Sequence, residues 1–285
     1  MSRLAEYAEL VKLPHTLFAL PFALAGALLG AGGLPPLAVA GWVVVAMVGA
    51  RTAGMAFNRL ADRRFDAANP RTADRALPAG RVRPAEAWAL VAGGVGLFLL
   101  ACWALNGWTL ALAPLALALV LGYSLTKRFT HGSHLVLGAA LALAPFGGWL
   151  ASRGTPAGFP WPLSLAVLAW VAGFDTLYAC LDVDFDRRAG LYSLPARFGP
   201  AGALALARWF HALAFAGFVA TGWWADLGWP WWLGLSGAGV ALVAQHALVK
   251  PGDLSRMQLA FFTLNAGVST VLLLATWASL TPWGR

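Results

Sequence analysis

The sequence predicts an all-α integral membrane protein, with about nine transmembrane helices in a bundle around a central lipid-accessible cavity. Hydrophobic residues make up 60% of the chain and charged residues 11%, with a mean hydropathy of +0.69. Soluble domains carry about 25% charged residues. Apolar runs of about 20 residues, the length of a helix that crosses a bilayer, recur along the chain. They are rich in Leu and Ala and lack the period-two alternation of a barrel strand.

The predicted segments leave no room for a second folded unit, so we expect one transmembrane domain over residues 1–285. Interior prolines such as Pro114 and Pro145 are tolerated in bilayer helices. Tryptophans near segment ends, such as Trp223 and Trp224, are typical of the membrane interface. The predicted helices span about 14–33, 36–58, 84–105, 108–126, 133–152, 161–181, 201–222, 229–249 and 258–279.

The basic residues predict the orientation. With nine helices, the N-terminus and every second connection share one side, and the opposite connections hold only Arg153 and Asp226. The positive-inside rule then places the charged side in the cytoplasm of a multi-pass protein of the inner (plasma) membrane. The basic residues expected on that side are Arg3, Lys12, Arg59, Arg63, Arg64, Arg71, Arg75, Arg81, Arg83, Lys127, Arg128, Arg187, Arg188, Arg197, Lys250 and Arg256.

The net charge of +8 would suggest a nucleic-acid partner in a soluble protein. In a membrane protein it indicates orientation and anionic ligands, so we expect no nucleic acid. Cys102 and Cys180 both lie inside apolar runs, and no disulfide framework is implied.

Two stripes of acidic residues occur where apolar segments meet the long charged connections, about 59–83 and 182–200. Asn58, Asp62 and Asp66 are spaced four apart, which places them on one face of a helix. Asp182 and Asp186 repeat this spacing downstream, and Asp175 lies two turns before Asp182. Ordinary charged loops explain the arginines, but the positive-inside rule does not require aspartates. Carboxylates beside guanidinium groups favour Mg²⁺ bridged to a lipid diphosphate.

Two charges lie deeper in the predicted bilayer. Arg51 precedes Asn58 by seven residues, and Asp175 precedes Asp182 by seven. A charge at the bilayer centre costs about 2.5–3.5 kcal/mol on insertion scales, so these side chains are expected to face a wet interior. Snorkelling or an ion pair is the structural alternative for Arg51. A membrane transporter that uses Arg51 and Asp175 is the functional alternative.

Three motifs together resemble the UbiA superfamily of intramembrane aromatic prenyltransferases. The resemblance spans nearly the whole chain in motif order and spacing. The first motif is Asn58-x-x-x-Asp62-x-x-x-Asp66, followed by Asn69-Pro-Arg71 and Arg75-Ala-Leu-Pro78. The second is Tyr123-x-x-x-Lys127-Arg128-x-Thr130. The third is Asp175-x-x-Tyr178-x-x-x-Asp182-x-x-x-Asp186.

The resemblance implies a Mg²⁺-dependent enzyme that acts on a polyprenyl diphosphate, an aromatic acid acceptor and membrane lipid. The metal ligands would be Asp62, Asp66, Asp182, Asp186 and Asn58. The diphosphate would be neutralised by Arg71, Lys127 and Arg128, with Arg75 in support. Tyr123 would stabilise an allylic cation, and Tyr178 would do so unless it serves only in packing. Asp175 would orient the acceptor or take its proton.

The acceptor is expected to be 4-hydroxybenzoate or a dihydroxynaphthoate, in ubiquinone or menaquinone biosynthesis. The opening from Lys12 to Phe22 and the run His131-Gly-Ser-His134 resemble bacterial quinone-pathway members, and Ala56-Phe57-Asn58-Arg59 favours the menaquinone branch. His15 is expected at the cytoplasmic start of the first helix, either at the acceptor carboxylate or simply at the interface. Another lipid-phosphate transferase is a further alternative.

Overall fold

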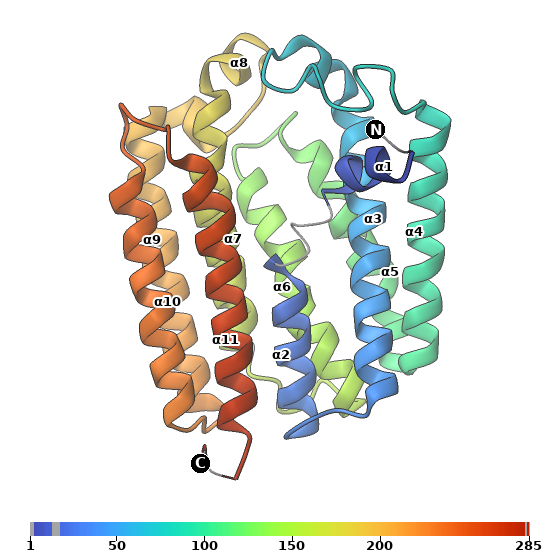
Figure 1. The fold of residues 1–285 in the computed structure, drawn as a ribbon, viewed down its shortest axis with the longest axis vertical. Helices are drawn as coiled ribbons and strands as arrows, with labels where there is room; N and C mark the ends of the chain where they lie inside the picture. The colour runs from blue at the N-terminus through green and yellow to red at the C-terminus, as the bar shows by residue number, and fades with distance from the viewer. Residues whose placement is uncertain (1–2, 13–17, 283, 285) are drawn as a thin grey trace.

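The computed structural model describes residues 3–12, 18–282 and 284, and within these residues it is a helical bundle without a β-strand (Figure 1). The fold class predicted from the sequence is confirmed. The helices are α1 (Arg3–Val11), α2 (Leu20–Ala31), α3 (Leu37–Ala68), α4 (Pro84–Leu105), α5 (Gly107–Thr126), α6 (Ser133–Arg153), α7 (Trp161–Ala179), the short 3₁₀ turn η2 (Cys180–Asp182), α8 (Val183–Arg188), α9 (Leu194–Trp224), α10 (Trp229–Leu248), η3 (Leu259–Leu264) and α11 (Asn265–Ser279).

Seven helical stretches in the described residues are long and apolar enough to cross a bilayer. The prediction of about nine also counted α2 and α10. Over its described residues α2 has 12 residues, about 18 Å of helix, which is short for a full crossing. Tryptophans together with Gln245 and His246 lower the hydropathy of α10. The seven stretches are Leu37–Ala68, Pro84–Leu105, Gly107–Thr126, Ser133–Arg153, Trp161–Arg188, Leu194–Trp224 and Leu259–Ser279.

The first acidic stripe lies on α3, a helix that continues beyond the end of its apolar segment. The apolar run was predicted to end near residue 58, but α3 continues to Ala68. Asn69 ends it, because its backbone has an extended conformation while its N–H still donates to the carbonyl of Phe65 at 3.0 Å. Asn58, Asp62 and Asp66 therefore share one rigid face, and the loop that follows covers 69–83.

The second acidic stripe follows a helix whose geometry changes at the motif. After α7 the chain tightens into η2, and Asp182 leaves helical geometry with φ −113° and ψ 7° before α8 begins. Ser193 caps α9, because its hydroxyl oxygen accepts the N–H of Ala196 at 3.2 Å. Gly199, at φ +71°, breaks α9 one residue before Pro200. The second connection is thus mostly helical.

The last transmembrane helix begins with a π-helical turn, η3, which no pattern in the sequence predicted. Its widened geometry is accompanied by a buried polar pair. Asn265 donates to the carbonyl of Phe261 at 2.7 Å, and Gln245 donates to the Asn265 side-chain oxygen at 2.7 Å. Both side chains are fully buried. The pair fixes the position of Phe261, whose ring lies 4.2 Å from that of Tyr178 between centroids.

The bundle surrounds an interior in which small residues allow helices to approach closely. A Cβ atom on Gly26 of α2 would overlap the carbonyl of Pro145 in α6, and one on Gly148 of α6 would overlap the carbonyl of Ala23 in α2. Small residues play this role at many membrane helix contacts. The charged loops, α1 and α8 gather at the upper end in Figure 1, where the N-terminus lies, and the C-terminus lies at the other end.

We expect Gly148→Ala to destabilise the protein by about 1–3 kcal/mol, because the added methyl group overpacks the contact between α2 and α6. Gly147→Ala is the matched control, since no atom of another described helix lies within 4 Å of its added Cβ. Thermal unfolding in detergent measures both. Equal transition temperatures for the two variants would contradict the close packing described here.

The charge distribution predicts that Arg188 faces the cytoplasm and Asp226 the opposite side. Both residues are exposed, while Cys102 and Cys180 are buried and give little background labelling. In intact cells, a membrane-impermeant maleimide should label Asp226→Cys at once and Arg188→Cys only after the membrane is disrupted. The reverse pattern would overturn the predicted orientation.

Candidate functional site

A polar pocket of about 250 Å³ opens among α3, the loop 69–83, the end of α5, α6 and the path from α7 to α8. Twelve of the thirteen residues proposed for the site from the sequence line it. His15, the thirteenth, lies outside the described residues. The twelve are Asn58, Asp62, Asp66, Arg71, Arg75, Tyr123, Lys127, Arg128, Asp175, Tyr178, Asp182 and Asp186.

The first stripe enters the pocket from α3. The Asn58 side-chain amide donates to Asp62 at 3.0 Å, one turn away on the same face. Asp66 is buried and pairs with two arginines: Arg75 reaches one oxygen at 2.7 Å, and Arg59 lies 3.8 Å from the other. Arg59 is itself buried and donates to the Asn58 oxygen at 3.3 Å. The stripe is therefore compensated by positive charge from its own helix and from the loop that follows.

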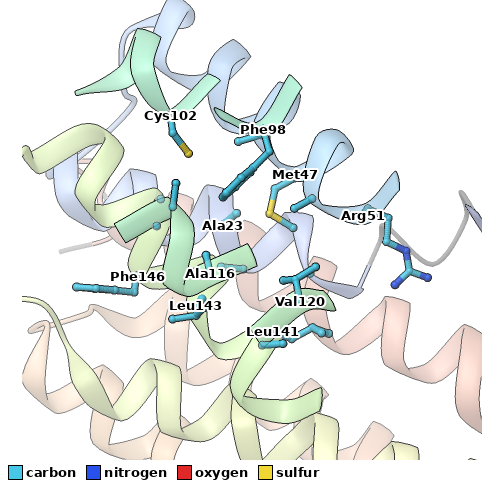
Figure 2. A pocket seen from close by; sticks show the side chains of 18 of the residues that line it. Ala23, Met47, Arg51, Phe98, Cys102, Ala116, Val120, Leu141, Leu143 and Phe146 are labelled. Atoms are coloured by element: carbon cyan, nitrogen blue, oxygen red, sulfur yellow. The ribbon is translucent and has the colours of Figure 1, made fainter. Parts of the chain in front are cut away.

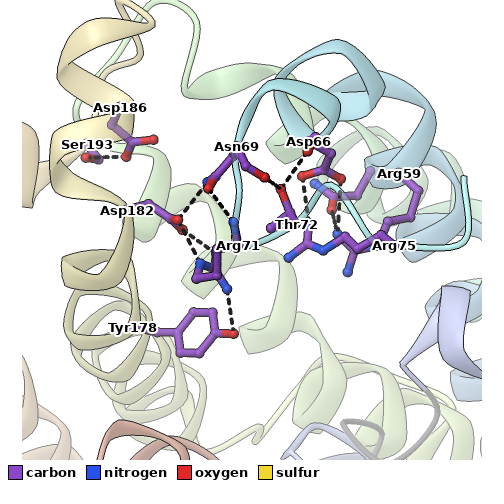
Figure 3. A network of polar contacts seen from close by, with 11 residues as sticks. Arg59, Asp66, Asn69, Arg71, Thr72, Arg75, Tyr178, Asp182, Asp186 and Ser193 are labelled. Atoms are coloured by element: carbon purple, nitrogen blue, oxygen red, sulfur yellow. Dashed lines mark hydrogen bonds and ion pairs between the residues drawn. The ribbon is translucent and has the colours of Figure 1, made fainter. Parts of the chain in front are cut away.

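The second stripe faces the first across the pocket (Figure 3). Asp182 accepts two hydrogen bonds from Arg71, one from Nε at 2.8 Å and one from a terminal nitrogen, which is the forked geometry of a strong ion pair. Arg71 also donates to the Tyr178 hydroxyl at 3.1 Å. Asp186 is buried and accepts from the Ser193 hydroxyl at 2.9 Å.

The loop 69–83 connects the two stripes. Its Asn69 amide donates to Asp182 at 2.9 Å, and the Asn69 oxygen accepts the backbone N–H of Arg71 at 3.0 Å. Thr72 donates to the carbonyl of Asp66 at 3.0 Å. Through Arg71 and Arg75, one short loop thus reaches a carboxylate of each stripe. Sequence reasoning assigned no role to Asn69, Thr72 or Ser193, because their partners are set by loop geometry and carry no helical spacing.

Positive charge exceeds negative charge in this pocket. Seven cationic and five carboxylate side chains line it. Burial and the fields of Arg59 and Arg75 lower the pKa of Lys12, which lies at the end of α1. Burial alone would also lower the pKa of Lys127, but Asp186, Asp175, Asp62 and Asp182 together raise it. The Lys127 ammonium therefore keeps its charge at neutral pH, and the site favours a polyanionic ligand.

Arg128 is already anchored. One of its terminal nitrogens donates to the carbonyl of Ala61 at 2.6 Å, and its guanidinium carbon lies 5.8 Å from the centroid of the Phe65 ring. The remaining donors of its planar fork stay available to a ligand in the pocket.

The donor set fits a hard divalent cation. One oxygen of Asp66 is buried and makes no hydrogen bond within the described residues, and Asp62 has acceptor capacity beyond its single bond from Asn58. The described residues contain no group of three or more acidic, His or Cys side chains close enough to enclose an ion by themselves. Mg²⁺ usually binds one or two carboxylates and completes its shell with water and substrate phosphates, so this donor set suits it.

An apolar hollow of about 220 Å³ adjoins the polar pocket, between α2, α3, α4, α5 and α6 (Figure 2). The two cavities share Arg51, Met55, Tyr123, Leu137 and Leu141. Arg51 lies at the edge of the hollow in Figure 2, and its Nε is buried without a hydrogen-bond partner in the described residues. The junction thus combines an aromatic ring, a cation with one unsatisfied donor and an apolar chamber.

At its inner end the polar pocket holds Asp175, whose Oδ2 lies 2.6 Å from Nδ1 of His134. The imidazole is fully buried behind the pocket wall, whereas the carboxylate side chain is 23% exposed. Asp175 of α7 therefore offers a carboxylate acceptor to the pocket, and its side chain is held in place by His134 of the neighbouring helix α6.

Comparisons with known proteins identify the family of this chain. Residues 19–267 match the UbiA prenyltransferase family. The 4-hydroxybenzoate octaprenyltransferase of Alkalilimnicola ehrlichii is 34% identical over 252 residues, covering 86% of this chain and 84% of that protein. The enzyme of the same name from Chromohalobacter salexigens is 37% identical over 224 residues, covering 78% and 74%.

Solved structures show the same fold. The apo structure of a UbiA homologue from Aeropyrum pernix K1 matches with a TM-score of 0.84 and 40% identity, covering 92% of this chain and 96% of that one. A UbiA homologue from Archaeoglobus fulgidus, solved with GPP and Mg²⁺, matches with a TM-score of 0.70 at 20% identity, covering 96% and 99%.

We expect Arg71→Lys to weaken the binding of Mg²⁺-pyrophosphate about tenfold. Lysine keeps the charge but loses the fork, which removes about one charge-assisted hydrogen bond. Isothermal titration of the detergent-solubilised protein measures the affinity. Arg64→Lys is the control, because Arg64 is exposed on the same part of α3. Unchanged affinity in Arg71→Lys would exclude Arg71 from the anion site.

Proposed function

This chain belongs to the UbiA prenyltransferase family and is an aromatic prenyltransferase, and from this premise we propose its substrates and the roles of its residues. The donor is a polyprenyl diphosphate. The acceptor is a hydroxylated aromatic carboxylate of the 4-hydroxybenzoate type, used in quinone biosynthesis. The reaction depends on Mg²⁺ and takes place at the cytoplasmic side of the membrane, which the positive-inside rule supports.

One observation carries the proposal: a cationic pocket with two acidic faces joins an apolar hollow at Arg51 and Tyr123. A polyprenyl diphosphate has a polyanionic head and a long apolar tail. Its head suits the polar pocket, and its tail suits the hollow.

The leaving group is stabilised by charge. When the allylic C1–O bond breaks, its electron pair leaves with the diphosphate. Arg71 and Lys127 lie in the pocket to accept that charge, and Arg128 and Arg75 line the same wall. Mg²⁺, held by Asp62, Asp66, Asp182 and Asp186 with Asn58 in support, would act as a Lewis acid on the phosphate oxygens.

The allylic cation that remains must be kept from water. Tyr123 lines both cavities where C1 would lie, and its ring face attracts a cation. Tyr178 and Phe261 form a second aromatic wall of the polar pocket. The aromatic lining thus excludes water on the side where the acceptor enters and favours the cation electrostatically.

The acceptor is proposed to lie between Arg51 and Asp175. Arg51 has an unsatisfied donor that a carboxylate would complete. The ring carbon beside the acceptor hydroxyl forms the new C–C bond with C1, and the ring proton passes to the Asp175 carboxylate. The 4-hydroxybenzoate relatives support the benzoate acceptor. The opening from Lys12 to Phe22 and the Asn58-Arg59 context keep dihydroxynaphthoate as the second candidate.

The decisive assay combines membranes, Mg²⁺, labelled polyprenyl diphosphate and either 4-hydroxybenzoate or dihydroxynaphthoate. We expect prenylated product with 4-hydroxybenzoate, its loss with EDTA, and a rate at least about 100-fold lower in Asp182→Asn, because that change removes a ligand charge and the partner of Arg71. Asp184→Asn, two residues along on the exposed side of α8, should retain activity.

Product with dihydroxynaphthoate alone would replace the acceptor assignment. Equal rates in Asp182→Asn and Asp184→Asn would refute the metal site. Flux of substrate across proteoliposomes without covalent product would favour the transporter that Arg51 and Asp175 suggested.

A further inference from the structure

We propose that His134 is a positioning residue that aims the Asp175 carboxylate at the aromatic acceptor. This inference rests on the proposed role of Asp175 and extends the site by one side chain outside the pocket lining. His134 is the second residue of α6, Asp175 lies near the end of α7, and the third participant is the backbone of Leu194 at the start of α9.

The two contacts of the His134 ring favour one tautomer. The backbone N–H of Leu194 points at Nε2, with an N–N distance of 3.4 Å. A backbone amide is only a donor, so Nε2 must be the acceptor and carry no proton. The proton is therefore on Nδ1, where it is donated to Asp175 Oδ2 at 2.6 Å.

The arrangement leaves one carboxylate oxygen for the substrate. His134 engages Oδ2, and Oδ1 of Asp175 makes no hydrogen bond within the described part of the chain. The Asp175 side chain reaches the pocket with 23% exposure, while the imidazole behind it has none. One oxygen is thus held by His134, and the side chain that carries the other oxygen lines the pocket.

The same contacts favour a positioning role for His134 over that of a proton acceptor. During the reaction the ring proton of the acceptor passes to Asp175, and the C–H electron pair returns to the aromatic ring. Nδ1 already carries a proton and Nε2 is occupied by Leu194, so His134 has no site for a second one without losing a contact. The proton leaves Asp175 toward the pocket, and His134 acts by holding the carboxylate in one rotamer.

Two side-chain amides separate this role from a purely structural one. In His134→Asn, the amide N–H takes the place of Nδ1–H and can still donate to Asp175, but the contact with Leu194 is lost. In His134→Gln, the amide oxygen takes the place of Nε2 and can accept from Leu194, but the donor to Asp175 is lost. If His134 only anchors α9, Asn is the damaging change; if it positions Asp175, Gln is.

The experiment measures kcat and the KM for each substrate in the full-length enzyme, together with thermal stability and Mg²⁺-pyrophosphate binding as a test of folding. We expect His134→Gln to lower kcat by about 10- to 100-fold, the value of one hydrogen bond to a charged group, with the KM for the donor unchanged. His134→Asn should remain within a few-fold of the wild type. His131→Asn is the control, because His131 packs on Tyr192 and does not line the pocket.

A double-variant cycle completes the test. In an Asp175→Asn background, His134→Gln should cause no additional loss, since a residue that acts through Asp175 has nothing left to position. Full activity in His134→Gln, or equal loss in the Asn and Gln variants that follows their loss of stability, would overturn the inference. Absence of prenylated product in the wild type would instead refute the proposed function.

Discussion

The structure depends on the mutual neutralisation of charges that come from distant parts of the chain. Carboxylates buried near a bilayer are costly unless they are paired. Here the loop 69–83 supplies the pairing: Arg75 neutralises Asp66 on α3, and Arg71 neutralises Asp182 after α7. Without that loop, Asp66 would keep only the longer contact with Arg59 at 3.8 Å, and Asp182 would lose its ion pair with Arg71. The loop therefore has two roles. It connects the two halves of the bundle at their charged end, and it forms part of the polar pocket.

Below this charged layer the interior becomes apolar within a short distance. Arg51 and Tyr123 mark the boundary, since both line the polar pocket and the hollow beneath it. The hollow is bounded by helices that approach closely through small residues, such as Gly148 of α6 against Ala23 of α2. Most of the side chains that line the hollow are apolar. The charged diphosphate of the proposed donor thus meets the polar pocket, and its apolar prenyl tail meets the adjoining hollow.

Most of the membrane helices and both acidic faces could be predicted from the sequence. Helix periodicity is a local property of the chain, and the thickness of the bilayer sets a regular helix length. The four-residue spacings of Asp62 with Asp66 and of Asp182 with Asp186 predicted two acidic faces. The end of α3 could not be found in the same way, since hydropathy reports contact with lipid and α3 stays helical for ten residues after its apolar run ends. The departure of Asp182 from helical geometry, the π turn η3 and the contacts of Asn69 arise from tertiary packing. His134 was noticed only as part of a motif, because its partner lies 41 residues away.

The forked ion pair between Arg71 and Asp182 has a consequence for which molecules occupy the pocket. A guanidinium that already serves a carboxylate with two hydrogen bonds must give up part of that arrangement before it serves an incoming anion. A weakly charged phospholipid headgroup offers little in exchange, whereas a densely charged one accompanied by its own counter-ion can relieve both partners together. The bilayer around the protein is rich in phospholipid phosphates. Competition between Asp182 and these phosphates for Arg71 therefore disfavours the entry of membrane phospholipids into the pocket.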